Sequence, residues 1–177
     1  MELTLEDLKE SMRHFSSVQC EALTENCIAA LEAIPHKSNC KLEISGIYNG
    51  SVKLKWTKDF KRNGYKDEIK ITEKAAEALS FFLVLQHTEY EVIEESRRGT
   101  GIDYWLCYKE DSDKYDPFNF LNARLEISGI LRESKSNSFS KRIKIKENQT
   151  EASDNTRIPA YVSIIEFSNL KAYIDKK

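Results

Sequence analysis

The stretch Gly99-Thr-Gly-Ile-Asp-Tyr-Trp-Leu-Cys-Tyr108 places an acidic residue between a glycine turn and a run of apolar side chains. A second stretch, Ala123-Arg-Leu-Glu-Ile-Ser-Gly-Ile130, places a glutamate inside an apolar pattern typical of a strand. If the two strands are antiparallel neighbours in a suitable register, Asp103 and Glu126 can converge on one face of a sheet. A carboxylate inside an apolar strand costs free energy unless it is paired or bound to a metal ion. These two residues are therefore the first candidates for a functional site.

The pattern around these strands predicts an ordered series of helices and strands from residue 72 onward. Thr72 is expected to cap the first helix, whose second half is apolar on all sides and should be buried. The predicted elements are a helix over 73–86, strands over 89–96, 102–108 and 121–131, a basic helix over 139–150 and a strand over 160–167. The alternating basic residues of 141–146 are also compatible with a strand, and residues 169–177 carry only a weak pattern.

The N-terminal part of the chain predicts helices followed by a hairpin. Residues 4–34 have apolar side chains at helical spacing, and Pro35 ends that pattern. Two alternating runs, 40–48 and 51–56, flank Asn49-Gly50, which is the strongest short-range signal for a β-hairpin.

The length of 177 residues predicts one domain. We expect an α+β fold with a central mixed β-sheet flanked by helices. Residues 1–70 should form an N-terminal extension of helices and a β-hairpin within the same domain. Residues 71–177 should form a core with the element order αβββαβ.

Composition limits the classes of protein to which the chain can belong. There are 27 Lys and Arg residues against 29 Asp and Glu, a net charge of −2, which argues against a protein that coats DNA through overall positive charge. No apolar run approaches the ~20 residues that span a bilayer, and the acidic start differs from a signal peptide. We therefore expect a cytoplasmic protein that does not enter a membrane.

The four cysteines include no C-x-x-C pair, and no histidine lies near a cysteine at zinc-ligand spacing, so we expect free cysteines in the core.

The element order and the placement of the two acids resemble the PD-(D/E)XK nuclease-like superfamily, whose core is restriction-endonuclease-like. The chain also resembles a group of uncharacterised bacterial proteins that share the strings G-x-D-Y-W-L, R-L-E-x-S-G-I and V-x-x-x-E-F-S. These strings occupy residues 101–106, 124–130 and 162–168 here. The resemblance covers residues from roughly 70 to 168.

This resemblance implies a metal-dependent phosphodiesterase and assigns roles to residues. Glu77, Asp103 and Glu126 would hold Mg²⁺ or Mn²⁺, with Glu77 (or Glu73) as the acid that the preceding helix contributes. These hard cations prefer oxygen ligands, which fits a site made of carboxylates.

One position departs from the family pattern. The family places a lysine two residues after the second acid, and this chain has Ser128 there. A serine cannot supply the positive charge that stabilises the transition state. Lys146, with Arg142 one helical turn earlier, is the candidate source of that charge from the following helix.

Each candidate also has a simpler interpretation. Glu126 could pair with Arg124 or with a basic residue of a neighbouring strand. Asp103 could only satisfy the N–H groups of the glycine turn. Glu77 could be a solvated residue on the polar face of its helix, and Lys146 could belong to a solvated basic face.

Two clusters of basic residues are relevant to whether the protein binds nucleic acid. Residues 51–70 hold seven Lys and Arg against three acids, and residues 132–146 hold six against one. Clustered cations are what contact with nucleic acid requires, although lysines of this kind also serve solubility.

Three hypotheses for the function remain. The first, which the resemblance implies, is a metal-dependent nuclease. The second is a non-catalytic relative that acts as a protein-interaction or regulatory module, and the third is a structural partner in a larger assembly.

Overall fold

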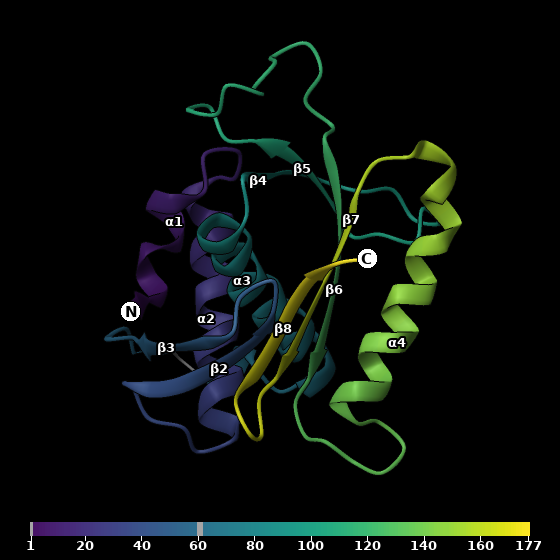
Figure 1. Cartoon of the computed structure of the whole chain (residues 1–177). Coiled ribbons are helices and arrows are strands. Elements are labelled where there is room, and N and C mark those ends of the chain that lie inside the picture. Colours follow the sequence, from purple (N-terminus) through teal and green to yellow (C-terminus); the bar gives the residue numbers. More distant parts are fainter. Residues whose placement is uncertain (1, 60–61) are drawn as a thin grey trace.

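The computed structural model describes residues 2–59 and 62–177 as helices packed on a mixed β-sheet (Figure 1). The strands are β1 (Glu2–Thr4), β2 (Cys40–Gly46), β3 (Gly50–Lys55), β4 (Tyr90–Glu95), β5 (Tyr104–Tyr108), β6 (Ala123–Ile130), β7 (Ala160–Glu166) and β8 (Lys171–Lys176). The helices are α1 (Leu8–Ser11), α2 (Ser17–Ala33), α3 (Glu68–His87) and α4 (Phe139–Gln149), with short 3-10 turns η1 (Leu5–Asp7), η2 (Arg62–Gly64) and η3 (Thr150–Thr156). The predicted α+β class with a mixed sheet is confirmed.

The strands form one sheet in the order β1-β3-β2-β8-β7-β6-β5-β4. Strands β4, β5 and β6 are antiparallel neighbours, whereas β6 and β7 are parallel. Strand β8 pairs antiparallel with β7 and parallel with β2, and so joins the N-terminal hairpin to the rest of the sheet.

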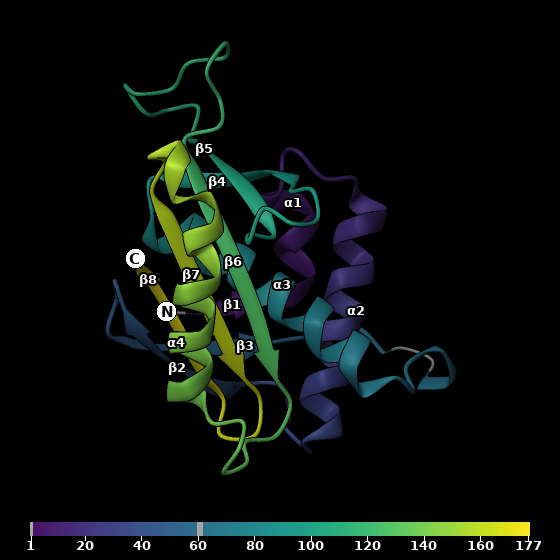
Figure 2. The same cartoon turned by 90° about the vertical axis from the view of Figure 1, so that its right-hand side faces the viewer.

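Helices cover the two faces of the sheet unequally. Helices α2 and α3 pack against each other, and α3 lies on β6 and β7. Helix α4 lies by itself on the opposite face, against β6 and β7 (Figures 1 and 2). The main apolar core fills the space between the sheet and the helices α2 and α3, and a smaller cluster of Ile130, Val162 and Ile164 lies under α4.

Close packing of α3 on β6 depends on a glycine. A Cβ atom at Gly129 would lie 2.5 Å from the backbone oxygen of Thr72, which is too close for any side chain. The glycine therefore lets the first half of α3 approach the end of β6, and this approach sets one wall of the site described below.

Several sequence predictions need correction at their boundaries. Helix α3 begins at Glu68 and not after Thr72, because the Asp67 side chain accepts hydrogen bonds from the backbone N–H groups of Ile69 and Lys70. Thr72 lies inside the helix, and its hydroxyl donates to the Glu68 carbonyl.

The two ends of the chain also differ from the prediction. The segment predicted to have little structure contains β8, and the first predicted helix is preceded by the three-residue strand β1. The hairpin of β2 and β3 around Asn49-Gly50 is confirmed. The prediction of a helix in the basic segment 139–150 is also confirmed, because this segment forms α4 and not a strand. None of the helices in the described part of the chain is both long and apolar enough to cross a bilayer.

Helix α2 provides a test of local stability. Ser16 caps it through a reciprocal capping box: the Ser16 hydroxyl accepts from the Gln19 N–H at 3.2 Å, and the Gln19 side chain accepts from the Ser16 N–H at 3.0 Å. We expect Ser16→Ala to lower the free energy of unfolding by about 1 kcal/mol, measured by urea denaturation. Ser17→Ala is the matched control, and equal stabilities of the two variants would contradict the assignment of the cap.

Candidate functional site

An open cleft of about 940 Å³ lies where α3, the segment joining β4 to β5, the end of β6 and helix α4 meet. Charged residues of both signs line it, including Glu73, Glu77, Glu95, Asp103, Arg97, Arg98, Arg132, Arg142 and Lys146. The cleft therefore brings Asp103 together with side chains of α3, β6 and α4, whereas Glu126 is fully buried and is not among the residues that line it.

Asp103 is fixed by the pairing of β5 with β6. Its backbone N–H donates to the Leu125 carbonyl at 2.9 Å, and its carboxylate oxygen Oδ2 accepts from the Ile127 N–H at 2.8 Å. These contacts hold the Asp103 carboxylate beside Glu126, which is the convergence that the sequence predicted. The Asp103 carboxylate therefore reaches β6, so the simpler interpretation that it only satisfies the glycine turn is wrong.

The glycine turn itself packs against the end of α4. Gly101 has a φ of +74°, a conformation that favours glycine, and a Cβ atom there would lie 2.4 Å from the Gln149 carbonyl oxygen. This contact ties the segment before Asp103 to the helix that carries Lys146.

Glu126 is fully buried in β6. Its Oε1 accepts a hydrogen bond from the Lys146 ammonium, whereas Oε2 is buried and has no hydrogen-bond partner among the described residues. Burial and the neighbouring charge of Asp103 raise the pKa of Glu126 to about 7, although Lys146 acts in the opposite direction. Only one oxygen of this carboxylate thus has a hydrogen-bond donor among the described residues, and the Asp103 carboxyl is its acidic neighbour.

Arg124 does not neutralise Glu126. Its guanidinium donates to the Ile158 carbonyl at 2.8 Å and to the Ser153 hydroxyl at 2.7 Å, and it pairs with Asp154 at 3.1 Å. The simpler interpretation of Glu126 as the partner of Arg124 is therefore wrong, and the cation that reaches Glu126 comes from α4.

Glu77 lies on α3 at the wall of the cleft. The Lys74 ammonium and the Tyr104 hydroxyl each donate to its carboxylate at 2.8 Å, and only 14% of its side chain is exposed. Burial raises the pKa of Glu77, while Lys74 and Tyr104 lower it. Glu77 is therefore not an ordinary solvated residue.

The three predicted acidic residues do not gather around one point. Among the described residues, the only three Asp, Glu, His or Cys side chains with donor atoms all within 4.8 Å of one another belong to a different cluster. Glu77 thus lines the same cleft as Asp103 but does not share a single set of ligand atoms with Asp103 and Glu126.

Helix α4 supplies two cations to this region. Arg142 donates to the Ser128 hydroxyl at 3.0 Å and is held by the Asn137 side chain at 2.7 Å. Lys146, one turn further along, also donates to Gln149 at 3.1 Å. Positive charge therefore stands beside Ser128, the position at which the sequence lacks a lysine.

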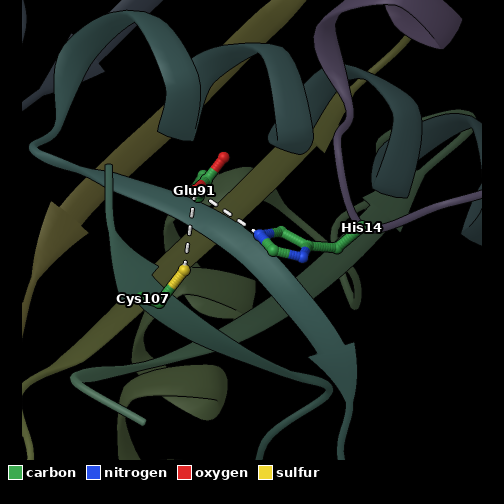
Figure 3. Close-up of side chains that lie close together, drawn as sticks. All are labelled: His14, Glu91 and Cys107. Carbon is green, nitrogen blue, oxygen red and sulfur yellow. Dashed lines mark hydrogen bonds and ion pairs between the residues drawn. The ribbon is translucent and has the colours of Figure 1, made fainter. Parts of the chain in front are cut away.

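A second cluster of ligand-type side chains lies at the other end of β4 and β5 (Figure 3). His14, Glu91 and Cys107 have donor atoms within 4.8 Å of one another, an arrangement that could hold a metal ion. Burial, and secondarily Glu91, raise the pKa of the Cys107 thiol to about 11, so the thiol is protonated and is not an activated nucleophile.

Sequence reasoning missed this cluster, although it found the acids of the cleft. Because Glu91 and Cys107 lie on opposed strands and His14 precedes α2, no local spacing reveals the three together. All four cysteines are free, as predicted.

No family model matches the chain, and no curated protein or solved structure is detectably similar to it.

Proposed function

We propose that the protein is a metal-dependent phosphodiesterase of the nuclease-like class, with Asp103 and Glu126 as ligands of Mg²⁺ or Mn²⁺. The observation that carries the proposal is the buried oxygen Oε2 of Glu126, which has no partner among the described residues and stands beside a second carboxylate. Two neighbouring carboxylates repel each other, and the Lys146 ammonium contacts only one oxygen of Glu126, so a proton or a divalent cation between the two acids would stabilise the arrangement.

The topology supports the proposal. The series α3-β4-β5-β6-α4-β7 has three antiparallel strands followed by a parallel one, with α3 and α4 on opposite faces. This agrees with the αβββαβ core that the resemblance to PD-(D/E)XK nucleases implies. The resemblance implies that the two acids belong to the second and third strands; here Glu126 lies in β6, and Asp103 directly precedes β5, which begins at Tyr104 and not at residue 102 as predicted.

The donor set fits a hard divalent cation. Carboxylate oxygens are the ligands that Mg²⁺ and Mn²⁺ prefer, and the described residues that line the cleft include no sulfur or imidazole ligand that would favour a softer metal. A bound ion of this kind would supply a Lewis acid and an activated water for hydrolysis of a phosphodiester. Glu77 lies at the wall of the cleft, where its carboxylate could contact a metal-bound water.

The basic residues of the cleft provide the remaining chemistry. Lys146 stabilises the ionised form of Glu126, and Arg142 places a guanidinium beside Ser128. Together with Arg97 and Arg98, these groups place cations in the cleft, among its acidic residues, that could contact an anionic phosphodiester. We therefore propose nucleic acid as the class of substrate.

The test is cleavage of single- and double-stranded DNA and RNA with Mg²⁺ or Mn²⁺. We expect cleavage that a chelator abolishes and that Lys146→Met lowers by at least about tenfold. Lys144→Met, which changes an exposed lysine of the same helix, should leave the rate unchanged. Metal binding without cleavage of any substrate would instead favour a non-catalytic relative that acts as an interaction or regulatory module.

A further inference from the structure

The cluster of His14, Glu91 and Cys107 is assembled by the fold from three separate segments. Glu91 and Cys107 are directly opposed in the antiparallel pair of β4 and β5, so their side chains point to the same face. His14 lies between α1 and α2 and approaches the edge strand β4. Figure 3 shows the imidazole and the thiol directed at the same carboxylate from different sides.

The distances within the cluster suit an ion. The Nε2 atom of His14 lies 3.4 Å from Oε1 of Glu91, and the Sγ atom of Cys107 lies 3.8 Å from the same oxygen. A tetrahedral zinc ion with bonds of about 2.0–2.3 Å separates its ligand atoms by roughly 3.3–3.6 Å. The distance from His14 to Glu91 falls in this range, whereas the Cys107 thiol, which donates a hydrogen bond to Glu91, would move slightly closer on binding. A direct hydrogen bond between imidazole and carboxylate would instead be about 2.7–3.2 Å long.

The chemistry of the donors selects the metal. A thiolate and an imidazole are soft or borderline ligands that favour Zn²⁺ over Mg²⁺ or Mn²⁺. Glu91 and Cys107 are only 5% and 1% exposed, whereas the His14 side chain is 27% exposed and leaves a path from solvent.

Charge balance also favours a divalent ion. A thiolate and a carboxylate together neutralise Zn²⁺. The neighbouring Arg13 lies 3.6 Å from Glu91 and is itself paired with Glu110. Arg13 approaches Oε1 of Glu91, the same oxygen that faces His14 and Cys107, and its own charge is offset by Glu110.

We propose that His14, Glu91 and Cys107 form a zinc site that is separate from the cleft. Three protein ligands leave the fourth position of a tetrahedral ion to water. On binding, the bond between sulfur and hydrogen of Cys107 breaks, a bond between sulfur and zinc forms, and the proton passes to solvent.

Cobalt is a direct probe of this site. The chelator-treated, dialysed full-length protein should bind one Co²⁺ with the visible bands of a tetrahedral ion and a near-ultraviolet charge-transfer band from thiolate to cobalt. Zn²⁺ should displace the cobalt and remove both signals. Cys107→Ser should lose the charge-transfer band, and His14→Ala should weaken the binding of Co²⁺ and Zn²⁺ by at least about tenfold.

Two controls distinguish binding at this cluster from binding at another cysteine or in the cleft. Cys40→Ser, at a free cysteine outside the cluster, should keep the wild-type spectrum, and so should Asp103→Asn in the cleft. If Cys107→Ser does not fold, the affinity of His14→Ala for Co²⁺ and Zn²⁺ tests the proposal instead. Because His14 is partly exposed, this variant should fold. Absence of the charge-transfer band in the wild-type protein would overturn the proposal, and so would unchanged affinity in His14→Ala.

Discussion

Asp103→Asn is expected to lower metal-dependent cleavage of a phosphodiester substrate by at least about a hundredfold. The amide keeps the size of the side chain and an oxygen that can accept from the Ile127 N–H, so the pairing of β5 and β6 should persist. What it removes is the negative charge that stands beside Glu126. The loss should therefore appear in cleavage and not in the circular dichroism spectrum.

The comparison needs a matched aspartate outside the cleft. Asp113→Asn changes an exposed residue of the segment between β5 and β6 and should retain the wild-type rate. Rates measured over a range of Mn²⁺ concentrations separate weaker binding from slower chemistry. Full activity of Asp103→Asn at saturating Mn²⁺ would contradict the assigned role.

Glu126 should contribute a loss of stability to the metal-free protein as the pH rises from 4.5 to 7, and Glu126→Gln should remove that contribution. Glu126 has a folded pKa of about 7 against an ordinary value of 4.5. Over this range the unfolded chain releases its proton before the folded protein does, so rising pH favours unfolding. The contribution of this group to the free energy of unfolding should fall by on the order of 3 kcal/mol and then stay constant above pH 7.

Urea denaturation at a series of pH values, with a chelator present, measures this effect. The informative quantity is the difference between the wild-type and Glu126→Gln curves, because other groups also titrate in this range. Glutamine can still accept from Lys146, so the contact with α4 is preserved. Glu43→Gln, at an exposed position of β2, should follow the wild-type curve. Parallel curves for wild type and Glu126→Gln would show that burial does not raise the pKa of Glu126.

Local patterns were sufficient for most of the fold. Alternation around Asn49-Gly50 predicted the hairpin, and the apolar half of α3 predicted its burial. Strand β8 was missed because only Ala172 and Ile174 are buried in it, and its place between β2 and β7 depends on partners distant in sequence. The start of α3 was misplaced because a threonine before an apolar run can equally bond back to its own helix, as Thr72 does.

The candidate site was predictable only in its outline. A carboxylate within an apolar strand drew attention to Glu126, and the fold places Asp103 beside it. The unpartnered Oε2 atom and the contact of Arg142 with Ser128 depend on side-chain geometry that no sequence spacing encodes. The same holds for the second cluster, which requires the register of two strands with a bulge between Val92 and Glu94.

Direct binding of Mn²⁺, followed by loss of the paramagnetic resonance signal of the free ion, tests whether the neighbouring carboxylates of Asp103 and Glu126 hold a divalent cation. At pH 8 the wild-type protein should bind one Mn²⁺ ion more tightly than any further Mn²⁺ ion. His14→Ala should bind this first ion with the same affinity as the wild-type protein. Asp103→Asn and Glu126→Gln should each weaken that binding by at least about tenfold. A wild-type protein that leaves Mn²⁺ free, or affinities that do not change in either variant, would contradict a metal site at Asp103 and Glu126.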